Sequence, residues 1–216
     1  GDFVALGPDP VGAAERLSML PNARFVRGNT DRYTLVGDLP SLAPSPDDSL
    51  MPDQIRGLLG IAQSFAWTRG AISGAGMYDW LADVPVEERI ELPDGTRLLL
   101  VHASPGTDDG RGIAEEMTDD ELATALAGCD ADLVIVGHTH VSLQRTVNGV
   151  TVHNLGSVSL PKTDDRRAMW TLLTADESGY KLARRYVNYD LERVRAAFDA
   201  VHHPAAKGLQ EMFPTT

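Results

Sequence analysis

Two histidines stand one residue apart in the stretch VIVGHTH, directly after an apolar run that favours a β-strand. The run over residues 133–136 ends at Gly137, which lets the backbone turn sharply, and His138 and His140 follow. Because side chains repeat every second residue in an extended chain, we expect the two imidazoles to point to the same side. Such a pair could bind a metal ion, but two surface histidines on a loop would give the same pattern.

Three further polar side chains mark expected strand ends: Asp2 in GD, Asn29 in GNTD and His102 in LLLVHASP. Loops at one edge of a sheet are where α/β folds build their sites. One carboxylate, one amide oxygen and three imidazoles suit Mn²⁺, Fe, Zn²⁺ or Ni²⁺ better than Ca²⁺. The sequence therefore predicts a metal site, with the five side chains converging in a cluster about 6–7 Å across.

The elements that must position these residues follow from periodicity and turn signals. Helix-like segments first alternate with strands and hairpins then take over, which predicts α/β layers around mixed sheets. Hairpin turns are expected at Asp94-Gly95 and Asn148-Gly149, and Thr118 with Glu121 forms a capping box. We also expect a strand at 23–28, a loop at 36–50, a helical insert at about 51–85 and helices at 8–21 and 191–203.

Composition limits the class of protein. The 216 residues suffice for one generous domain, and 43% hydrophobic with 23% charged residues is ordinary for a globular chain. The sequence has no apolar run of the roughly 20 residues that span a bilayer and no signal-peptide pattern, and its single cysteine, Cys129, suits a reducing compartment. We therefore expect a cytoplasmic protein without membrane partners. The net charge of -12 disfavours a nucleic-acid polymer as partner.

The chain resembles the calcineurin-like metallophosphoesterase superfamily, in particular its small bacterial phosphodiesterase branch. The likeness runs through GDFVALGPDPVG, VRGNTD, LLLVHASP, VIVGHTH and NLGSVSLPKTDDRRA, in that order. The resemblance implies one domain over residues 1–216, a four-layer αββα sandwich with two divalent metal ions at the strand ends, for which we expect Mn²⁺. Carried over by position, Asp2 bridges both ions, Asn29, His102 and His138 complete one site, and His140 joins the other.

Two departures from the family pattern bear on function. The Asp-x-His of the family's first strand matches nothing in these residues, so we expect the domain to be N-terminally incomplete. The expected missing segment has roughly 25–40 residues, one βα unit plus a strand, and precedes Gly1. Thr30 stands where many members have a histidine that protonates the leaving group, and a hydroxyl is no general acid near neutral pH. Asp31, the expected partner of that histidine, then lacks the side chain it would orient.

These observations predict a metal-dependent phosphoesterase, and more narrowly a phosphodiesterase, that hydrolyses a small phosphate ester with a metal-activated water. Asn29 is the expected catalytic residue beside Thr30 and Asp31, while Arg32 and His153 are candidates for substrate binding. The alternative is a weak or inactive scaffold of the same fold that binds protein partners. The sequence leaves the oligomeric state and the natural substrate open.

Overall fold

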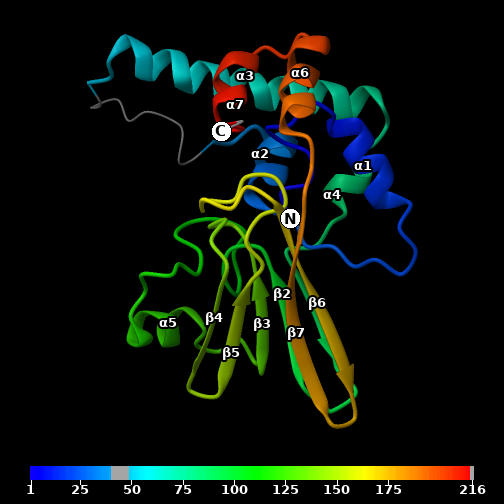
Figure 1. The fold of residues 1–216 in the computed structure, drawn as a ribbon, viewed down its shortest axis with the longest axis vertical. Helices are drawn as coiled ribbons and strands as arrows, with labels where there is room; N and C mark the ends of the chain where they lie inside the picture. The colour runs from blue at the N-terminus through cyan, green and yellow to red at the C-terminus, as the bar shows by residue number, and fades with distance from the viewer. Residues whose placement is uncertain (40–48, 215–216) are drawn as a thin grey trace. The chain divides into compact units, whose positions relative to one another are not determined.

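The computed structural model describes residues 1–39 and 49–214, which form two compact units (Figure 1). Unit 1 comprises Gly1, Arg24–Asn29 and Val84–Tyr189, and unit 2 comprises the described residues within 2–23, 30–83 and 190–216. Most of the loop predicted over 36–50 falls on residues 40–48, which lie outside the described residues.

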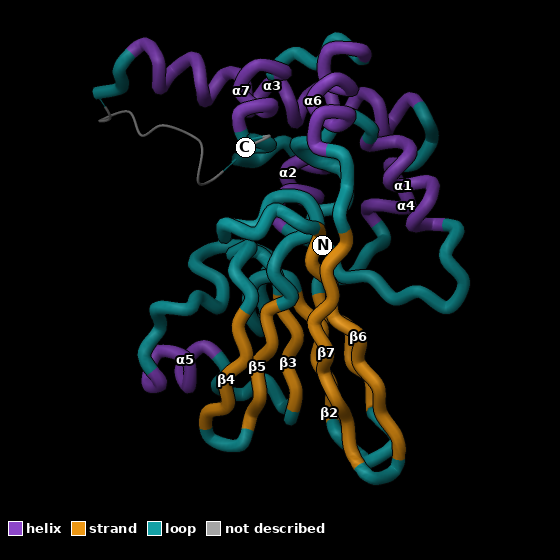
Figure 2. The backbone as a smooth tube through the Cα atoms, in the orientation of Figure 1, coloured by secondary structure: helices purple, strands orange, loops and turns teal. Residues whose placement is uncertain are grey.

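Unit 1 is built on a five-stranded mixed sheet in the order β1-β2-β3-β5-β4. Strands β2, β3 and β5 run parallel, while β1 and β4 pair antiparallel at the two edges. The loops that follow β2, β3 and β5 therefore all start from the same end of the sheet, where the carboxyl ends of these parallel strands lie (Figure 2). The bounds are β1 Glu87–Glu91, β2 Arg97–Val101, β3 Leu133–Val136, β4 Leu143–Val147, β5 Val150–Asn154, β6 Ala168–Asp176, β7 Gly179–Val187 and α5 Asp119–Ala125.

The central strands β2 and β3 are buried on both faces, which explains their continuous apolar runs. Leu99 and Val134 face a core that includes Leu122 of α5. Leu98 and Leu133 face the other way, onto a cluster shared with the antiparallel hairpin of β6 and β7. A fully buried Leu or Val contributes about 1.5–3 kcal/mol relative to an exposed one, so these runs hold α5, the sheet and the hairpin together as three layers.

Unit 2 is helical, and its helices begin where the sequence provides start signals. Asp9 and Asp190 accept hydrogen bonds from backbone N–H groups of the first turns of α1 and α6, and Pro52 opens α3. None of the helices in residues 1–39 and 49–214 combines the length and the apolar character needed to cross a bilayer. The helices are α1 Pro10–Ser18, α2 Asn29–Val36, α3 Pro52–Gly74, α4 Tyr78–Ala82, α6 Leu191–Ala200 and α7 Ala206–Glu211.

The predicted α/β fold with two sheets and flanking helices is confirmed, as are both hairpin turns and the Thr118 capping box. The strand predicted over 23–28 is wrong. This stretch lies outside the strands of the sheet, and the Arg27 N–H donates to the carbonyl of Pro85 instead of joining a ladder. Helix α2, which begins at Asn29, was not predicted, because its Thr and Val residues are weak helix formers.

A buried histidine joins the C-terminal helices of unit 2 to α3. The His203 side chain is only 4% exposed, and its Nδ1 accepts the N–H of Ala205 at 3.1 Å. Its Nε2 lies 3.4 Å from the Ser64 hydroxyl, and its ring packs edge-on against Trp67 and Phe198. Since Nδ1 acts as an acceptor, the ring is neutral in this arrangement, and desolvation lowers the pKa of His203.

The free energy of unfolding should therefore depend on pH through His203. A pKa lowered in the folded state means that the unfolded chain binds more protons below the ordinary value of about 6.5, so stability present above that pH is lost as the pH falls. The expected slope is at most about 1.4 kcal/mol per pH unit for this group. Urea titrations between pH 7.5 and 5 should give a shallower pH dependence for His203→Asn than for the natural chain, and equal slopes would contradict this role.

Candidate metal centre

His138 and His140 lie in the loop after β3, and both have a left-handed backbone, with φ of 63° and 65°. The predicted reason for their common direction, strand alternation, is therefore wrong. Non-glycine residues adopt this conformation at a cost, and such residues cluster where surrounding contacts fix a functional geometry. The two rings nevertheless contact different segments, Gly110 for His138 and Leu160 for His140.

The His138 ring is fixed by a backbone carbonyl. Its Nε2 lies 2.8 Å from the Gly110 oxygen, which can only accept, so Nε2 carries the proton. In the neutral ring Nδ1 then carries a lone pair, and it lies 3.2 Å from the Asn29 Oδ1, a second acceptor. Two acceptor atoms at this distance repel each other. The contact becomes favourable if Nδ1 is protonated, if the Asn29 amide is rotated by a half-turn, or if both atoms bind a cation.

The spacing of these two atoms fits a cation. With metal–ligand distances of roughly 2.0–2.2 Å, donors separated by 3.2 Å subtend an angle of about 100° at the ion, within the range of tetrahedral and octahedral sites. Ligating histidines also commonly donate their other ring N–H to a carbonyl, as His138 does to Gly110. The residues present therefore fit a divalent transition metal ion.

His102 joins the same group. It directly follows β2, is 5% exposed, and its ring centre lies 5.2 Å from that of His138. Its surroundings are tight, since a Cβ added to Gly1 would lie 2.7 Å from the His102 Nδ1 and 2.6 Å from the Gly28 nitrogen. Unit 1 thus brings Asn29, His102 and His138 together, and only glycine fits at position 1.

His140 is fixed by a different segment. Its Nδ1 lies 2.8 Å from the Leu160 carbonyl oxygen, and its own carbonyl accepts the Lys162 N–H at 3.2 Å. Because Nδ1 must donate to a carbonyl, Nε2 is the ring nitrogen with the lone pair, which is the form that a metal binds. The segment after β5 therefore sets the tautomer of His140.

Unit 2 holds the acidic candidates. The backbone N–H groups of Asp2 and Phe3 donate to the Asp31 carboxylate at 2.7 and 2.8 Å, and Asp31 is 0% exposed. The Thr30 N–H in turn donates to the Asp2 Oδ1 at 3.0 Å. Asp2 has a left-handed φ of 61°, so these bonds fix an unfavourable backbone. In this structure Asp31 holds the segment that carries Asp2.

The two predicted substrate-binding residues contact other protein groups. Arg32 pairs with Asp38 at 2.6 Å within unit 2. His153 is buried beneath the β6–β7 hairpin, where its Nε2 lies 2.8 Å from the Thr171 hydroxyl. Desolvation, followed by the positive charge of Arg184, lowers the pKa of His153. Contact of either residue with a substrate stays a prediction.

No group of three or more His, Cys, Asp or Glu side chains suited to hold a metal occurs within residues 1–39 and 49–214. Asn29 is not one of these four residue types, and its Oδ1 lies 3.2 Å from the His138 Nδ1. Asp2 belongs to unit 2, whereas Asn29 and the three histidines belong to unit 1. The five-residue cluster therefore stays a prediction, of which unit 1 brings together Asn29, His102 and His138.

Two supports of His138 were not predicted from the sequence. Gly110 provides the carbonyl described above, and Gly112 has a left-handed φ of 65°. A Cβ at Gly112 would lie 2.8 Å from the His138 Cδ2 and 3.2 Å from the Thr139 Cγ2. The spacing GRG in the loop after β2 was the available signal, because closely spaced glycines often mark a tight approach.

Asn154, the last residue of β5, is the third support that was missed. Its amide nitrogen donates to the Gly137 carbonyl at 2.7 Å and to the Thr139 hydroxyl at 3.0 Å, and its oxygen accepts the Gly156 N–H at 3.0 Å. The residue is 0% exposed. Asn154 therefore clamps the loop that carries both candidate histidines.

Comparison with protein-family models matches residues 1–178 to the calcineurin-like phosphoesterase superfamily domain. Comparison with curated protein sequences gave no match. A hypothetical protein from Pyrococcus horikoshii OT3 is 17% identical with a TM-score of 0.75, over 99% of this chain and 82% of that one. A metallophosphoesterase from Sphaerobacter thermophilus is 21% identical with a TM-score of 0.70, over 99% and 85%. These structures share the fold, and the family model, which spans most of the sequence, shows that the chain belongs to the calcineurin-like phosphoesterase superfamily.

Proposed function

We propose that the protein is a metal-dependent phosphoesterase that hydrolyses small phosphodiesters. The observation that carries this proposal is the pair of acceptor atoms, His138 Nδ1 and Asn29 Oδ1, held 3.2 Å apart while Gly110 takes the other ring proton. Two lone pairs at this separation suit a cation held between them. The family match supports the same reading.

In this proposal Asn29, His102 and His138 would hold one divalent ion, His140 would contribute to a second site, and the Asp2 carboxylate would belong to both. Mn²⁺ is the ion we propose, since the oxygen and imidazole donors suit it, with Fe, Zn²⁺ or Ni²⁺ as alternatives. Ions bound there would supply Lewis-acid polarisation of the phosphoryl group and activation of the attacking water. The Gly110 carbonyl holds a proton on the His138 Nε2, so in the neutral ring Nδ1 is the nitrogen that would bind the ion.

The leaving group sets the substrate class. Thr30 cannot donate a proton near neutral pH, and Asp31 holds the backbone of Asp2 and Phe3. A departing alkoxide would therefore leave without protonation from Thr30, which favours esters whose leaving groups have a low pKa. Aryl and cyclic diesters meet this requirement. The proposal includes a cytoplasmic location. A net charge of -12 disfavours polymeric nucleic acid, so we propose a small phosphate ester as the substrate.

Thr30→His should raise the turnover of phosphodiesters with poor leaving groups. An added general acid contributes about 10²–10⁴-fold when well placed, so a gain of at least about tenfold for an alkyl diester is expected, with little change for a 4-nitrophenyl diester. Rates measured across a series of leaving groups would show a shallower dependence on leaving-group pKa in the variant. Parallel plots for the two proteins would count against a role for position 30 in leaving-group departure.

The proposed function is tested by assaying the metal-stripped chain with bis(4-nitrophenyl) phosphate before and after adding Mn²⁺. Hydrolysis that appears only with the ion supports the enzyme. Bound Mn²⁺ without hydrolysis of any diester or monoester tried would instead favour the alternative, a scaffold of this fold that binds protein partners.

A further inference from the structure

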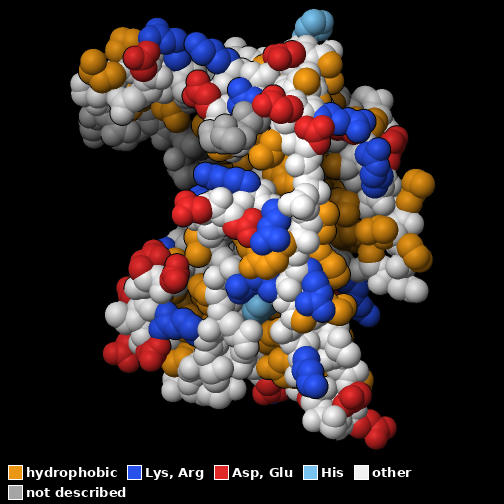
Figure 3. All heavy atoms as spheres, in the orientation of Figure 1, with side chains coloured by type: hydrophobic (Ala, Val, Ile, Leu, Met, Phe, Trp, Pro, Cys, Tyr) orange, Lys and Arg blue, Asp and Glu red, His pale blue; other side chains and the backbone are white. Residues whose placement is uncertain are grey.

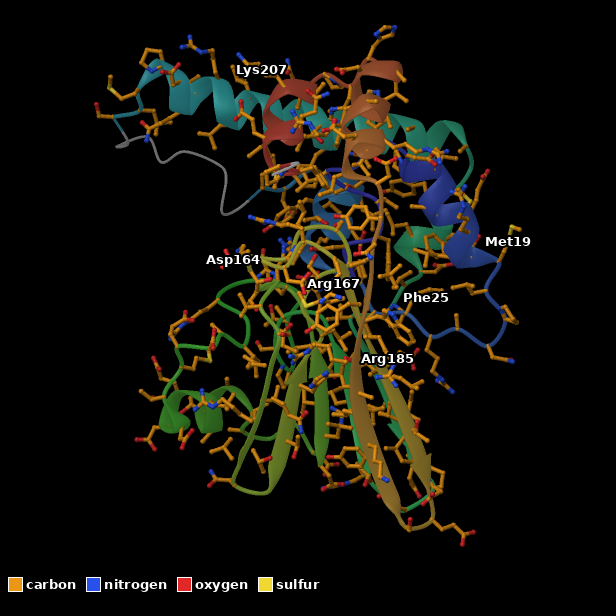
Figure 4. All side chains as sticks on the ribbon, in the orientation of Figure 1. Met19, Phe25, Asp164, Arg167, Arg185 and Lys207 are labelled. Carbon is orange, nitrogen blue, oxygen red and sulfur yellow. The ribbon has the colours of Figure 1, made fainter. Side chains whose placement is uncertain are left out.

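A loop over residues 157–167 is tied directly to His140. The His140 ring donates to the Leu160 carbonyl at 2.8 Å, and the Lys162 N–H donates back to the His140 carbonyl at 3.2 Å. This reciprocal pair places the backbone of Lys162 within one hydrogen bond of a candidate metal ligand. Figure 4 marks the end of this loop by Asp164 and Arg167.

The rest of the loop is also held by side chains of unit 1. The Tyr189 hydroxyl donates to the Ser159 carbonyl at 2.9 Å, and Arg166 donates to the Pro161 carbonyl at 3.0 Å. Three consecutive carbonyls, those of residues 159–161, are thus bound by a phenol, an imidazole and a guanidinium. Because these bonds already order the loop, it loses less conformational entropy when it binds a ligand.

Charge distinguishes Lys162 from most other cations of unit 1. Acidic and basic side chains neighbour one another on the face shown in Figure 3, and seven arginines of unit 1 lie within 4.0 Å of a carboxylate. Within the part of the chain that the structure describes, Lys162 and Arg166 form no such ion pair. Lys162 is exposed and its backbone N–H bonds to the His140 carbonyl, so it adds a positive charge to the loop that contacts His140 in a protein of net charge -12.

We propose that Lys162, supported by Arg166, binds a second anionic group of the substrate, so that the protein prefers phosphodiesters that carry a further phosphate. This inference rests on the proposed function, because the reacting phosphate would occupy the candidate metal centre. An ammonium on a fixed backbone attracts a phosphate dianion more than a neutral hydroxyl at the same place, and the attraction weakens with salt. The loop thereby sets substrate choice without touching the reacting bond.

The test compares two diesters that differ only in the second anion: thymidine 5′-(4-nitrophenyl phosphate) and its 3′-phosphorylated counterpart. With the Mn²⁺-loaded full chain, Lys162→Met should raise KM for the phosphorylated diester by about tenfold and leave kcat within about twofold. KM for the plain diester should not change. Lys181→Met is the matched control, since Lys181 is an exposed lysine on β7 that likewise forms no ion pair among the described residues, and it should alter neither KM.

Equal effects of Lys162→Met on both diesters, or none on either, would overturn the subsite. A natural chain that hydrolyses neither diester would contradict the proposed function, and binding then decides on the subsite alone. Calorimetric titration with thymidine 3′,5′-bisphosphate and thymidine 5′-monophosphate should show tighter binding of the bisphosphate, lost in Lys162→Met. Equal affinities of the natural chain for the two nucleotides would also overturn it.

Discussion

Replacing His138 by alanine should abolish Mn²⁺-dependent hydrolysis of bis(4-nitrophenyl) phosphate, lowering kcat/KM by roughly three orders of magnitude. The substitution removes Nδ1, which lies 3.2 Å from the Asn29 Oδ1, and leaves the amide as the remaining atom of that pair. Polarisation of a phosphoryl group by a bound ion is worth several kcal/mol, and each 1.36 kcal/mol is a factor of ten in rate. Steady-state kinetics with measured metal content would give both the loss of rate and the loss of bound ion.

His202→Ala is the control for this experiment. His202 is exposed in the turn just after α6 in unit 2, so replacing it removes a histidine that is not part of the candidate centre. Its kcat/KM and metal content should equal those of the natural chain. A His138→Ala variant that keeps full metal content and full activity would contradict the assignment of His138.

Replacing Asn154 by leucine should cost about 2–4 kcal/mol of unfolding free energy and also lower the affinity for Mn²⁺. Leucine keeps the approximate size but leaves the Gly137 carbonyl and the Gly156 N–H without their side-chain partner inside the protein. The loop between Gly137 and Thr139 could then relax from its left-handed geometry, moving His138. Urea unfolding and Mn²⁺ titration of the same samples measure the two effects.

Gln144→Leu is the matched control for Asn154→Leu. Gln144 is an exposed amide on β4, opposite His153 in the ladder, and its change to leucine should alter the unfolding free energy by less than about 0.5 kcal/mol. If both variants lose the same stability, or if Asn154→Leu retains full Mn²⁺ affinity, the clamp does not position the histidines.

Local signals in the sequence were enough to predict most of unit 1. The turns at Asp94-Gly95 and Asn148-Gly149 and the apolar runs of β2 and β3 depend on neighbouring residues alone, and all four features are present. The family itself followed from motifs in order, and the family match confirms it. The sequence pattern was therefore sufficient to predict those elements whose structure depends on only a few neighbouring residues.

Long-range contacts explain what the sequence did not predict. His138 and His140 have a left-handed backbone, Gly110 and Leu160 bond to their rings, and Asn154 bonds to Gly137 between β3 and His138. All three partners are distant in sequence from the two histidines. The prediction of a strand over 23–28 was also wrong because of long-range contacts, since a strand forms only where a partner strand pairs with it. Residue identity pointed to the candidate ligands, whereas their tautomers required the three-dimensional contacts.

The most direct test of the central claim is a crystal grown with Mn²⁺ and measured at the wavelength where manganese scatters anomalously. We expect an anomalous peak roughly 2.0–2.2 Å from both the His138 Nδ1 and the Asn29 Oδ1, with the Gly110 carbonyl still accepting from Nε2. An Asn29 amide turned so that its NH₂ donates to Nδ1, with manganese bound elsewhere or not at all, would contradict it.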